Sequence, residues 1–541
     1  MMNKRKLELY ENLFQNLGPG ISKTTITDIA SYFICSERHT RTLLKQMTTL
    51  GWLTWHPILG RGNRGEINCL IEPIDACYQA VDKATMANNL DLVYKLIGFN
   101  GRDTASGLWQ YLSQTVTTTE DTILVPFHRS IDWLHPHQAT GRTERHLIKE
   151  IYQTLLGNSN GQLNGNLAHT WEVSGDKRKW SFYLRPETVF HDLSRLTAAD
   201  VIASFHGLQR SVHWQRLYSN IEHIESCHND MLTIELKEPD ENFAWLLCRP
   251  ETAIMPKRLI FSRQTDFKAI GSGPFILSVN SNKLVRLKRF ANYNKDSALV
   301  ENIEYWIHHQ WAKNKRCAEN FFFLNHQSSS YQVTNDNVGC FVVLLNNPQL
   351  QTAAIKQQLM ALFNHQTTTI ELPFKISISH EDNNDSRRYA AQLTQAGNGH
   401  SQEVKFGHYL DRQDITLCGI RNEPNRITGF ISFLKLYPLW KQHLSLKQYQ
   451  KFQAYLSQLT TADSNQQHHI LTIVLQWLND QHLMTIISHE ELRLTIPESI
   501  QGVDINSIGW CNFKKLWIKP SVNEAKLHNI TLSGANLINL P

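Results

Sequence analysis

The chain has no long apolar run of the kind that crosses a membrane. Its most apolar segment, FISFLKLYPLW at 430–440, is interrupted by Lys435 and Pro438, whereas a membrane-spanning helix needs about 20 predominantly apolar residues. The first residues combine charges with an amphipathic pattern and do not form the apolar core of a secretory signal. We therefore expect a cytoplasmic protein with no membrane partner.

Paired cysteines and common catalytic motifs are also missing. The nine cysteines are scattered, odd in number and never spaced as C-x-x-C, so we expect reduced thiols and no zinc site. The 25 histidines do not have metal-ligand spacing, because neighbours such as His308 and His309 direct their side chains apart. The signatures of P-loop NTPases and HExxH zinc proteases do not occur. We therefore expect no metal, no cofactor and no catalytic residue.

One string, GNSNG at 157–161, matches the G-x-S-x-G pattern of hydrolases. A nucleophile elbow needs a strand before the serine and a helix after it. Here we expect a helix before Ser159 and a polar segment after it, so we interpret Ser159 as a loop residue. An enzyme of unknown type remains a third hypothesis that no motif supports.

The composition is that of an ordinary globular protein. With 541 residues, 41% hydrophobic and 19% charged, the chain has enough apolar material for several domains. Its formal net charge of +5 is modest for this length. Any binding to nucleic acid must therefore come from a local basic patch.

Such a patch lies in residues 24–69, whose pattern is typical of a winged helix-turn-helix. Residues 25–33 place apolar side chains at helical spacing, and Ser36 is a good N-cap for a second helix. In that helix Leu43, Leu44 and Met47 form an inward stripe. The charged side chains then face outward at the N-terminal end, where a recognition helix contacts bases and phosphates.

A two-stranded ribbon is expected after this helix, with the basic turn GRGNRG at 60–65 as its wing. GRGNRG also matches the dinucleotide fingerprint G-x-G-x-x-G, but that motif needs a helix after it, and here a strand is expected. A small helical domain that binds protein is the remaining alternative. The basic excess favours DNA, and the predicted contacts are Ser36, Glu37, Arg38, His39, Arg41, Thr42, Lys45, Arg61, Asn63 and Arg64.

The sequence pattern changes at residue 121, after which short strand-like segments alternate with segments of helical pattern. The motifs LAHTWEVS, WSFYLRPETVFHDLSRLTAADVIASF, MPKRLI, GSGPF and LKRFANYN follow one another in this order. They resemble motifs in the first of the two lobes of the extracellular solute-binding proteins that serve peptide and nickel transporters. Three further motifs, SERHTRTLL, GWLTW and GRGNRG, lie in the winged helix-turn-helix at residues 24–69 (the head), and NSIGWCNFKKLWIKP lies near the end of the chain. With all of these motifs, the chain resembles the SgrR family of transcriptional regulators.

The resemblance implies a multidomain α+β protein with a winged helix-turn-helix and a two-lobed α/β domain of the type II periplasmic-binding-protein class. We expect a winged helix-turn-helix at 1–72, a helical connector and linker at 73–120, solute-binding lobe I at 121–338, lobe II at 339–485, and a C-terminal return to lobe I at 486–541. In that family the signal is associated with sugar-phosphate stress. The resemblance thus implies an activator or repressor that binds double-stranded DNA and senses a small molecule, with self-association on DNA as a further expectation.

The ligand is the part that the resemblance defines least. The tract CGIRNEPNRITGF at 418–430 does not match the acidic tract by which peptide-binding relatives hold an amino terminus. From strand position alone, Arg129 and Trp133 are the predicted ligand contacts, because arginine suits an anion and an aromatic ring stacks on a sugar. The alternative function is a component of a peptide or nickel transporter whose N-terminal domain binds protein.

Overall fold

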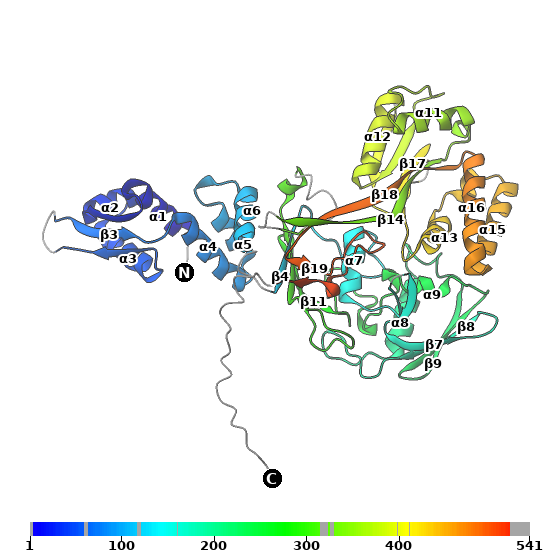
Figure 1. Cartoon of the computed structure of the whole chain (residues 1–541), viewed down its shortest axis with the longest axis horizontal. Coiled ribbons are helices and arrows are strands. Elements are labelled where there is room, and N and C mark those ends of the chain that lie inside the picture. Colours follow the sequence, from blue (N-terminus) through cyan, green and yellow to red (C-terminus); the bar gives the residue numbers. More distant parts are fainter. Residues whose placement is uncertain are drawn as a thin grey trace, which may run out of the picture. The chain divides into compact units, whose positions relative to one another are not determined.

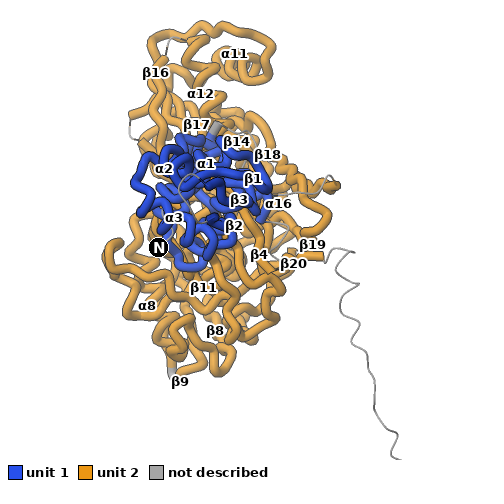
Figure 2. The backbone as a smooth tube through the Cα atoms, turned by 90° about the vertical axis from the view of Figure 1, so that its left-hand side faces the viewer, with its two compact units in different colours: residues 1–119, 306–314, 324–326 blue, residues 120–305, 315–323, 327–541 orange. Residues whose placement is uncertain are grey.

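The computed structural model describes residues 4–58, 63–115, 121–159, 161–313, 323–324, 329–397, 399–410 and 412–519. The chain forms two compact units, which Figure 2 distinguishes by colour. Unit 1 comprises 1–119, 306–314 and 324–326, and unit 2 comprises 120–305, 315–323 and 327–541. In the described part of the chain, none of the helices combines the length and apolar character that a membrane span requires.

The first part of unit 1 is a small helical domain with a three-stranded sheet. Its elements are α1 (Lys4–Leu17), β1 (Gly20–Thr24), α2 (Ile26–Phe33), α3 (Glu37–Thr49), β2 (Leu53–His56) and β3 (Gly65–Cys69). The antiparallel sheet has the order β1-β3-β2. The sequence predicted only the β2–β3 ribbon. Strand β1 was missed because it is short and its partner, β3, lies about 45 residues further along the chain.

Local capping explains where α2 and α3 begin and end. Thr25 and Asp28 form a capping box at the start of α2. Ile34 has a left-handed backbone (φ 51°) between the two helices, and Ser36 caps α3 by accepting a hydrogen bond from His39 N. The sequence-based prediction of these two helices is confirmed.

The second part of unit 1 is helical and includes a segment from later in the chain. It contains α4 (Pro73–Met86), α5 (Leu90–Ile97), η1 (Phe99–Gly101), α6 (Thr104–Thr115) and η4 (His309–Lys313). The Tyr94 hydroxyl donates to the carbonyl of Ile307 (2.6 Å), and Trp311 Nε1 donates to the carbonyl of Ala105 (3.2 Å). Residues 306–314 therefore complete the fold of the N-terminal unit.

Unit 2 begins with a lobe that contains two four-stranded sheets, of orders β11-β12-β13-β4 and β7-β8-β10-β9, and a β5-β6 hairpin. Its strands are β4 (Thr122–Phe127), β5 (Leu156–Ser159), β6 (Gln162–Gly165), β7 (Ala168–Val173), β8 (Lys179–Leu184), β9 (Ile221–His228), β10 (Met231–Leu236), β11 (Phe275–Asn280), β12 (Leu284–Arg289) and β13 (Asn302–Ile307). Its helices are α7 (Arg142–Ile151), α8 (Ala198–Gln209), α9 (Phe243–Leu246), η2 (Pro250–Thr252) and η3 (Lys257–Leu259).

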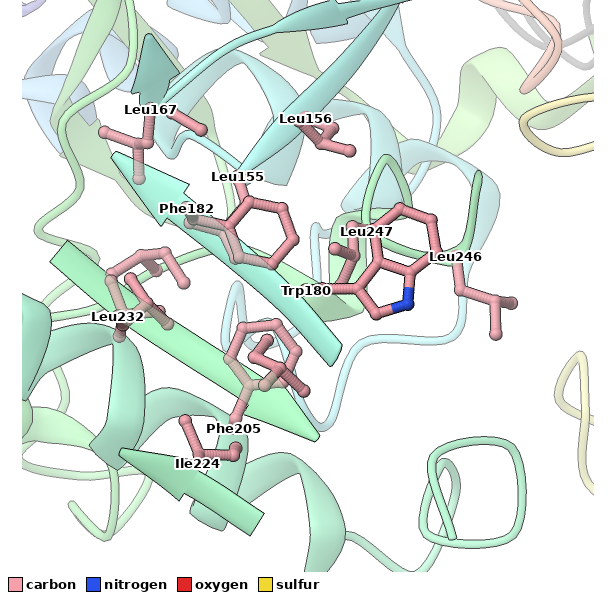
Figure 3. Close-up of a cluster of buried hydrophobic side chains, with 14 of the residues drawn as sticks. Leu155, Leu156, Leu167, Trp180, Phe182, Phe205, Ile224, Leu232, Leu246 and Leu247 are labelled. Atoms are coloured by element: carbon pink, nitrogen blue, oxygen red, sulfur yellow. The ribbon is translucent and has the colours of Figure 1, made fainter. Parts of the chain in front are cut away.

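The core of this lobe lies between the β7-β8-β10-β9 sheet and the helices beside it. Trp180, Phe182 and Leu232 project from the sheet toward Phe205 of α8 and Leu247 (Figure 3). All five side chains are buried. Because its core is closely packed, the first lobe is rigid and can hold the residues of an adjacent site in place.

The second lobe is built on a five-stranded sheet of order β16-β15-β17-β14-β18. Its elements are β14 (Ser330–Leu345), η5 (Pro348–Leu350), α11 (Ala353–Phe363), β15 (Ser377–Glu381), α12 (Asn384–Gly397), β16 (His400–Val404), β17 (Ile415–Arg421), α13 (Arg426–Leu436), α14 (Trp440–His443), α15 (Leu446–Thr461), α16 (Ser464–Asp480) and β18 (Met484–Pro497). The long strands β14 and β18 run side by side (Figure 1). After β18 come β19 (Ile500–Gln501), η6 (Phe513–Lys515) and β20 (Trp517–Ile518), and Phe513 N donates to Glu150 of α7 (3.1 Å).

Three local predictions in the first lobe differ from the structure. The pattern of residues 145–156 predicts a helix, but α7 ends at Ile151, because the Ile151 carbonyl accepts a hydrogen bond from Gly273 N (2.9 Å) and the chain turns into β5. The pattern of residues 253–260 predicts a step from strand to helix; the strand is absent there, and the helical part is the short helix η3. Ser159 ends strand β5 instead of lying in a loop, and no helix follows it, so the elbow geometry is excluded.

Candidate functional site

Helix α3 presents one polar face to solvent. Thr40, Leu43, Leu44 and Met47 are buried, and this fixes the helix against the rest of the head. On the opposite side the predicted DNA contacts Ser36, Arg38, His39, Arg41, Thr42 and Lys45 are exposed. Arg38, Arg41, Thr42 and Lys45 follow helical spacing, so they share one face. The structure thus brings four of the predicted residues together on one stripe.

Glu37 lies at the N-terminal end of the same face. Its Oε1 accepts a hydrogen bond from the Thr27 hydroxyl of α2 (2.8 Å), and its Oε2 pairs with Arg41 (3.2 Å). Glu37 is half-buried and Arg41 is exposed. The carboxylate therefore links the two helices of the helix-turn-helix through side chains that stand at the surface.

The predicted wing is described only in part. Asn63 and Arg64 are exposed where the chain enters β3, whereas Arg61 lies outside the described residues. Gly65 is required at the start of β3, because a Cβ there would lie 2.7 Å from the Trp55 ring and 2.8 Å from the His56 carbonyl oxygen. This close packing holds the start of β3, next to Arg64, against β2.

Unit 2 contains a cavity of about 330 Å³ between its two lobes. The first lobe contributes the start of α7, the segment 212–216 and Arg249, and the second contributes 406–409, the end of β17 and the face of α13. Such a volume is at the lower end of the range for small-molecule sites. The cavity therefore has the size and the position of a small-ligand site.

Two carboxylates and two guanidinium groups form a buried network at the cavity. Arg145 Nη2 lies 2.7 Å from both Glu251 Oε2 and Glu423 Oε2, and Arg249 Nε lies 2.5 Å from Glu251 Oε1. Arg145 is only 1% exposed and Glu423 2%. Burial alone would raise the pKa of Glu251, but the charges of Arg145 and Arg249 outweigh it and lower that pKa to about 2. Because Glu423 comes from the second lobe, the network ties the lobes together.

Arg421, at the end of β17, has a different environment. Its guanidinium lies 3.5 Å from the centre of the Phe406 ring, and its Nη1 lies 3.5 Å from the carbonyl oxygen of Thr140. None of the carboxylates that the structure describes forms an ion pair with it. Burial, together with the positive charges of Arg142 and Arg145, lowers the pKa of Arg421 to about 9. The negative charges of Glu381 and Glu423 oppose this shift without forming an ion pair, so Arg421 lines the cavity as a cation at neutral pH.

Several buried polar atoms at the cavity have no hydrogen-bond partner among the described residues. They are Arg145 Nη1, Trp214 Nε1 and Glu423 Oε1. Buried polar atoms are normally paired, so such atoms at a cavity are suited to ligand contacts. Four arginines line the cavity (Arg145, Arg216, Arg249 and Arg421) with one carboxylate, Glu423. Two further buried carboxylates, Glu251 and Glu381, bond to lining residues, so the positive charges outnumber the negative ones by one.

The predicted ligand contacts Arg129 and Trp133 do not line this cavity. Arg129 forms a two-pronged ion pair with Glu144 of α7 (2.7 and 3.1 Å). Trp133 packs edge-on against His135 and Phe267 and lines a separate hollow of about 580 Å³ on the first lobe. Their role as ligand contacts stays a prediction, and the structure does not bring them together with the interlobe arginines.

The sequence did not identify the residues that form the cavity. Arg145, Glu251 and Glu423 are separated by 106 and 278 positions in their hydrogen bonds, so no local motif unites them. One signal was present, because the tract that departs from the acidic pattern of the peptide-binding relatives carries both Arg421 and Glu423. In the described ranges, no group of three or more His, Cys, Asp or Glu side chains is placed to hold a metal ion.

The second unit resembles solved structures of two-lobed binding proteins. The agropinic acid-binding protein AgaA from A. tumefaciens R10 aligns with 74% of this chain and 99% of its own, with 14% identity and a TM-score of 0.59. A dipeptide-binding protein from a Pseudoalteromonas species aligns with 74% of this chain, also at 14% identity and a TM-score of 0.59. At these identities the likeness establishes the fold alone, a type II periplasmic-binding-protein fold, as the sequence predicted.

Curated relatives match almost the whole chain. A protein of Yersinia pestis named HTH-type transcriptional regulator SgrR is 25% identical across 96% of this chain and 100% of its own length. The protein of that name from Photorhabdus laumondii is 24% identical over the same shares. An uncharacterised Escherichia coli protein, YbaE, is 24% identical across 95% of this chain and 98% of its own.

Two family models match consecutive parts of the chain. Residues 5–119 match the model described as sugar transport-related sRNA regulator N-term, and 162–318 match the middle domain of bacterial extracellular solute-binding proteins, family 5. The first match coincides with the N-terminal portion of unit 1, and the second lies largely within the first lobe of unit 2. With both domains in this order and relatives named as SgrR regulators aligned over 96% of the chain, the chain resembles the SgrR regulators.

Proposed function

We propose that this protein is a transcriptional regulator that binds double-stranded DNA through unit 1 and a small anionic metabolite through unit 2. The exposed basic stripe of α3 carries the proposal, because it lies opposite a buried apolar stripe on the second helix of a helix-turn-helix. In such motifs the N-terminal half of this helix enters the major groove. Arg38, Arg41 and Thr42 would then contact base edges, and Lys45, Arg61 and Arg64 the phosphates.

The remaining predicted contacts act around this helix. Ser36 caps α3 and lies where a phosphate can meet the helix N-terminus. His39 and Asn63 are exposed beside the stripe and the wing, where they can donate to phosphate oxygens. A single head covers few base pairs, so we propose that two copies bind neighbouring half-sites. Because it would bind DNA, we propose that the protein acts in the cytoplasm, and the regulator names of its relatives support this.

The cavity supports the anionic class of the ligand. Arg421 is a cation without a carboxylate partner in the described part of the chain, and the wall has one net positive charge. Arginine donates two parallel hydrogen bonds to a carboxylate or a phosphate. A sugar phosphate has this anionic group, and its sugar face suits the aromatic wall formed by Trp214, Tyr409 and Phe433.

The buried network also argues against a cationic ligand. Glu423, the second-lobe carboxylate at the cavity, already accepts from Arg145, and Arg249 donates to its backbone carbonyl (2.8 Å). The other carboxylate oxygen of Glu423, Oε1, has no partner among the described residues, but a peptide amino terminus there would add a positive charge beside Arg145 and Arg249, which is unfavourable. The proposed ligand class therefore differs from the dipeptide named for the structural relative from Pseudoalteromonas.

The DNA part is tested by a gel-shift assay on genomic fragments with the full-length protein. We expect one or more promoter fragments to be retained in preference to random duplex, and Arg41→Ala to weaken this preference by about 5- to 150-fold. Gln46→Ala, an exposed neutral change on the same helix, serves as the control. Equal binding of wild type and Arg41→Ala to every fragment would contradict the assignment.

The ligand part is tested by thermal shift with hexose phosphates and the matching free hexoses. We expect only the phosphates to raise the melting temperature, since a ligand that binds the folded state alone stabilises it by mass action. Arg421→Gln should weaken the affinity about 10- to 150-fold, as expected for hydrogen bonds to a charged group. Arg195→Gln serves as the matched control, because Arg195 is an exposed arginine of the same unit that lies outside the cavity wall. An equal loss in both variants would refute the site.

A further inference from the structure

The two arginines at the start of α3 are not equivalent. Arg41 pairs with Glu37 (3.2 Å), whereas no ion pair in the described ranges involves Arg38. Glu37 is itself held, because the Thr27 hydroxyl of α2 donates to its other oxygen (2.8 Å). Arg41 is therefore oriented by a chain of three side chains that begins on the neighbouring helix.

This arrangement contributes little to folding. Glu37 is 44% exposed and Arg41 60%, and exposed pairs of this kind add little to stability. A negative charge on this face is also unfavourable for DNA binding in general, because the backbone of DNA is negative. Neither the stability of the fold nor the overall affinity for DNA therefore explains why Glu37 lies on this face.

From this juxtaposition we propose that Glu37 is a positioning residue that determines base specificity by holding Arg41 toward a guanine in the major groove. The inference rests on the proposed DNA-binding function. Arginine recognises guanine by donating to O6 and N7 at once, which requires a fixed guanidinium plane. Only one of the five guanidinium N–H donors of Arg41 is used by Glu37, so enough donors remain for both guanine acceptors.

Preorganisation gives the expected size of the effect. Ordering a long side chain on binding costs a factor of about 2 to 12 in affinity, and Glu37 with Thr27 removes part of this cost before DNA arrives. Arg38 lacks such support, so its side chain must be ordered on binding and should contribute less to discrimination than Arg41. Specificity at one base pair should therefore depend on Arg41, on Glu37 and on Thr27, in decreasing order.

The experiment uses the full-length protein and a selected duplex. Wild type first selects a preferred site from a random 30-bp duplex pool, where the length of about 30 bp accommodates two half-sites. Dissociation constants are then measured for that site and for every single-base-pair variant of it. The proteins compared are wild type, Arg41→Ala, Glu37→Gln, Thr27→Val, Thr27→Ser and Glu8→Gln. Glu8→Gln is the matched control, because Glu8 forms an exposed i,i+4 pair with Lys4 on α1.

The results expected are specific to a positioning role. Arg41→Ala identifies one G·C pair at which discrimination falls about 5- to 150-fold. Glu37→Gln should lower discrimination at the same pair by about 2- to 12-fold, while its affinity for random duplex is unchanged or higher. Thr27→Val should have a smaller effect in the same direction, and Thr27→Ser, which retains the hydroxyl, should match wild type. Melting temperatures should stay unchanged throughout.

Other outcomes overturn the inference. If Glu37→Gln retains full discrimination at the Arg41 base pair, the carboxylate does not position the arginine. If it alters the preference at another base pair, Glu37 contacts a base directly. A wild-type protein that selects no sequence at all removes the proposed function, and this inference with it; the two failures are therefore distinguishable.

Discussion

The molecule has two groups of arginines with opposite surroundings. In the head, Arg38 and Arg41 are exposed on α3, and one weak pair restrains one of them. At the interlobe cavity, Arg145 and Arg249 are buried and form short ion pairs with two buried carboxylates. The head is thus suited to a large, highly charged partner that salt can displace, and the cavity to a small partner with few charges.

The difference also predicts where mutations are costly. Exposed pairs contribute at most about 1 kcal/mol, because water and salt screen them. Removing one partner of a buried pair leaves an uncompensated charge, which costs about 3 to 5 kcal/mol. The same amino acid should therefore be nearly neutral for folding in one region and essential in the other.

The largest effect is expected for Arg145→Ala. The substitution leaves Glu423 buried without its side-chain partner, so we expect the free energy of unfolding of unit 2 to fall by about 3 to 5 kcal/mol. Urea unfolding of the full-length protein, followed by tryptophan fluorescence, measures this loss. Arg195→Ala is the control, because Arg195 forms a more exposed pair with Asp230. If the free energy of unfolding fell by a similar small amount in both variants, burial would not explain the difference between the buried and the exposed arginines.

A buried acid near the same cavity provides the second test. Glu381 is buried and accepts hydrogen bonds from Gly419 N (2.9 Å) and Gly407 N (3.4 Å), and burial raises its pKa from 4.5 to about 7. Since the pKa is raised on folding, its contribution to stability is complete below about pH 4.5 and is lost as the pH rises through 7.

Glu381→Gln removes this pH dependence. The variant stays neutral, so its stability relative to wild type should increase from pH 5 to pH 8, by up to about 3 kcal/mol. Melting curves of the two proteins at several pH values measure the difference. Glu150→Gln should behave in the same way up to a higher pH, since burial raises the pKa of Glu150 to about 8. A constant difference between variant and wild type at all pH values would contradict the assignment.

The sequence predicted the head better than the cavity, for a physical reason. Helices α2 and α3 depend on contacts within a few residues, such as the Thr25–Asp28 capping box and the Ser36 cap. The exposed face of α3 follows directly from the spacing of its apolar residues. Strand β1 was missed because its stability comes from pairing with β3, about 45 residues away.

The cavity depends almost wholly on distant contacts. Arg145 meets Glu251 and Glu423 only after the chain has formed both lobes. The end of α7 is likewise set by Gly273, whose Cβ, if present, would lie 2.6 Å from the carbon of the Ile151 carbonyl. The prediction that Arg129 and Trp133 contact the ligand depends on strand position alone. Strand position does not show which side chains form ion pairs with a distant part of the chain.

The smallest effect is expected for the phosphate contacts of the head. Lys45→Ala and Arg64→Ala should each weaken binding to all duplexes alike and lower the slope of log K against log salt by about 1, because each removes one released counterion. Discrimination between bases should not change, and neither should the melting temperature, since both side chains are exposed. Fluorescence anisotropy titrations between about 50 and 200 mM salt measure the slope. A variant that lost base discrimination but kept its salt slope would instead place that side chain against a base edge. In that case exposure alone would not separate the cations that bind phosphate from those that read bases. The distinguishing feature would instead be whether a neighbouring side chain orients the cation, as Glu37 does for Arg41.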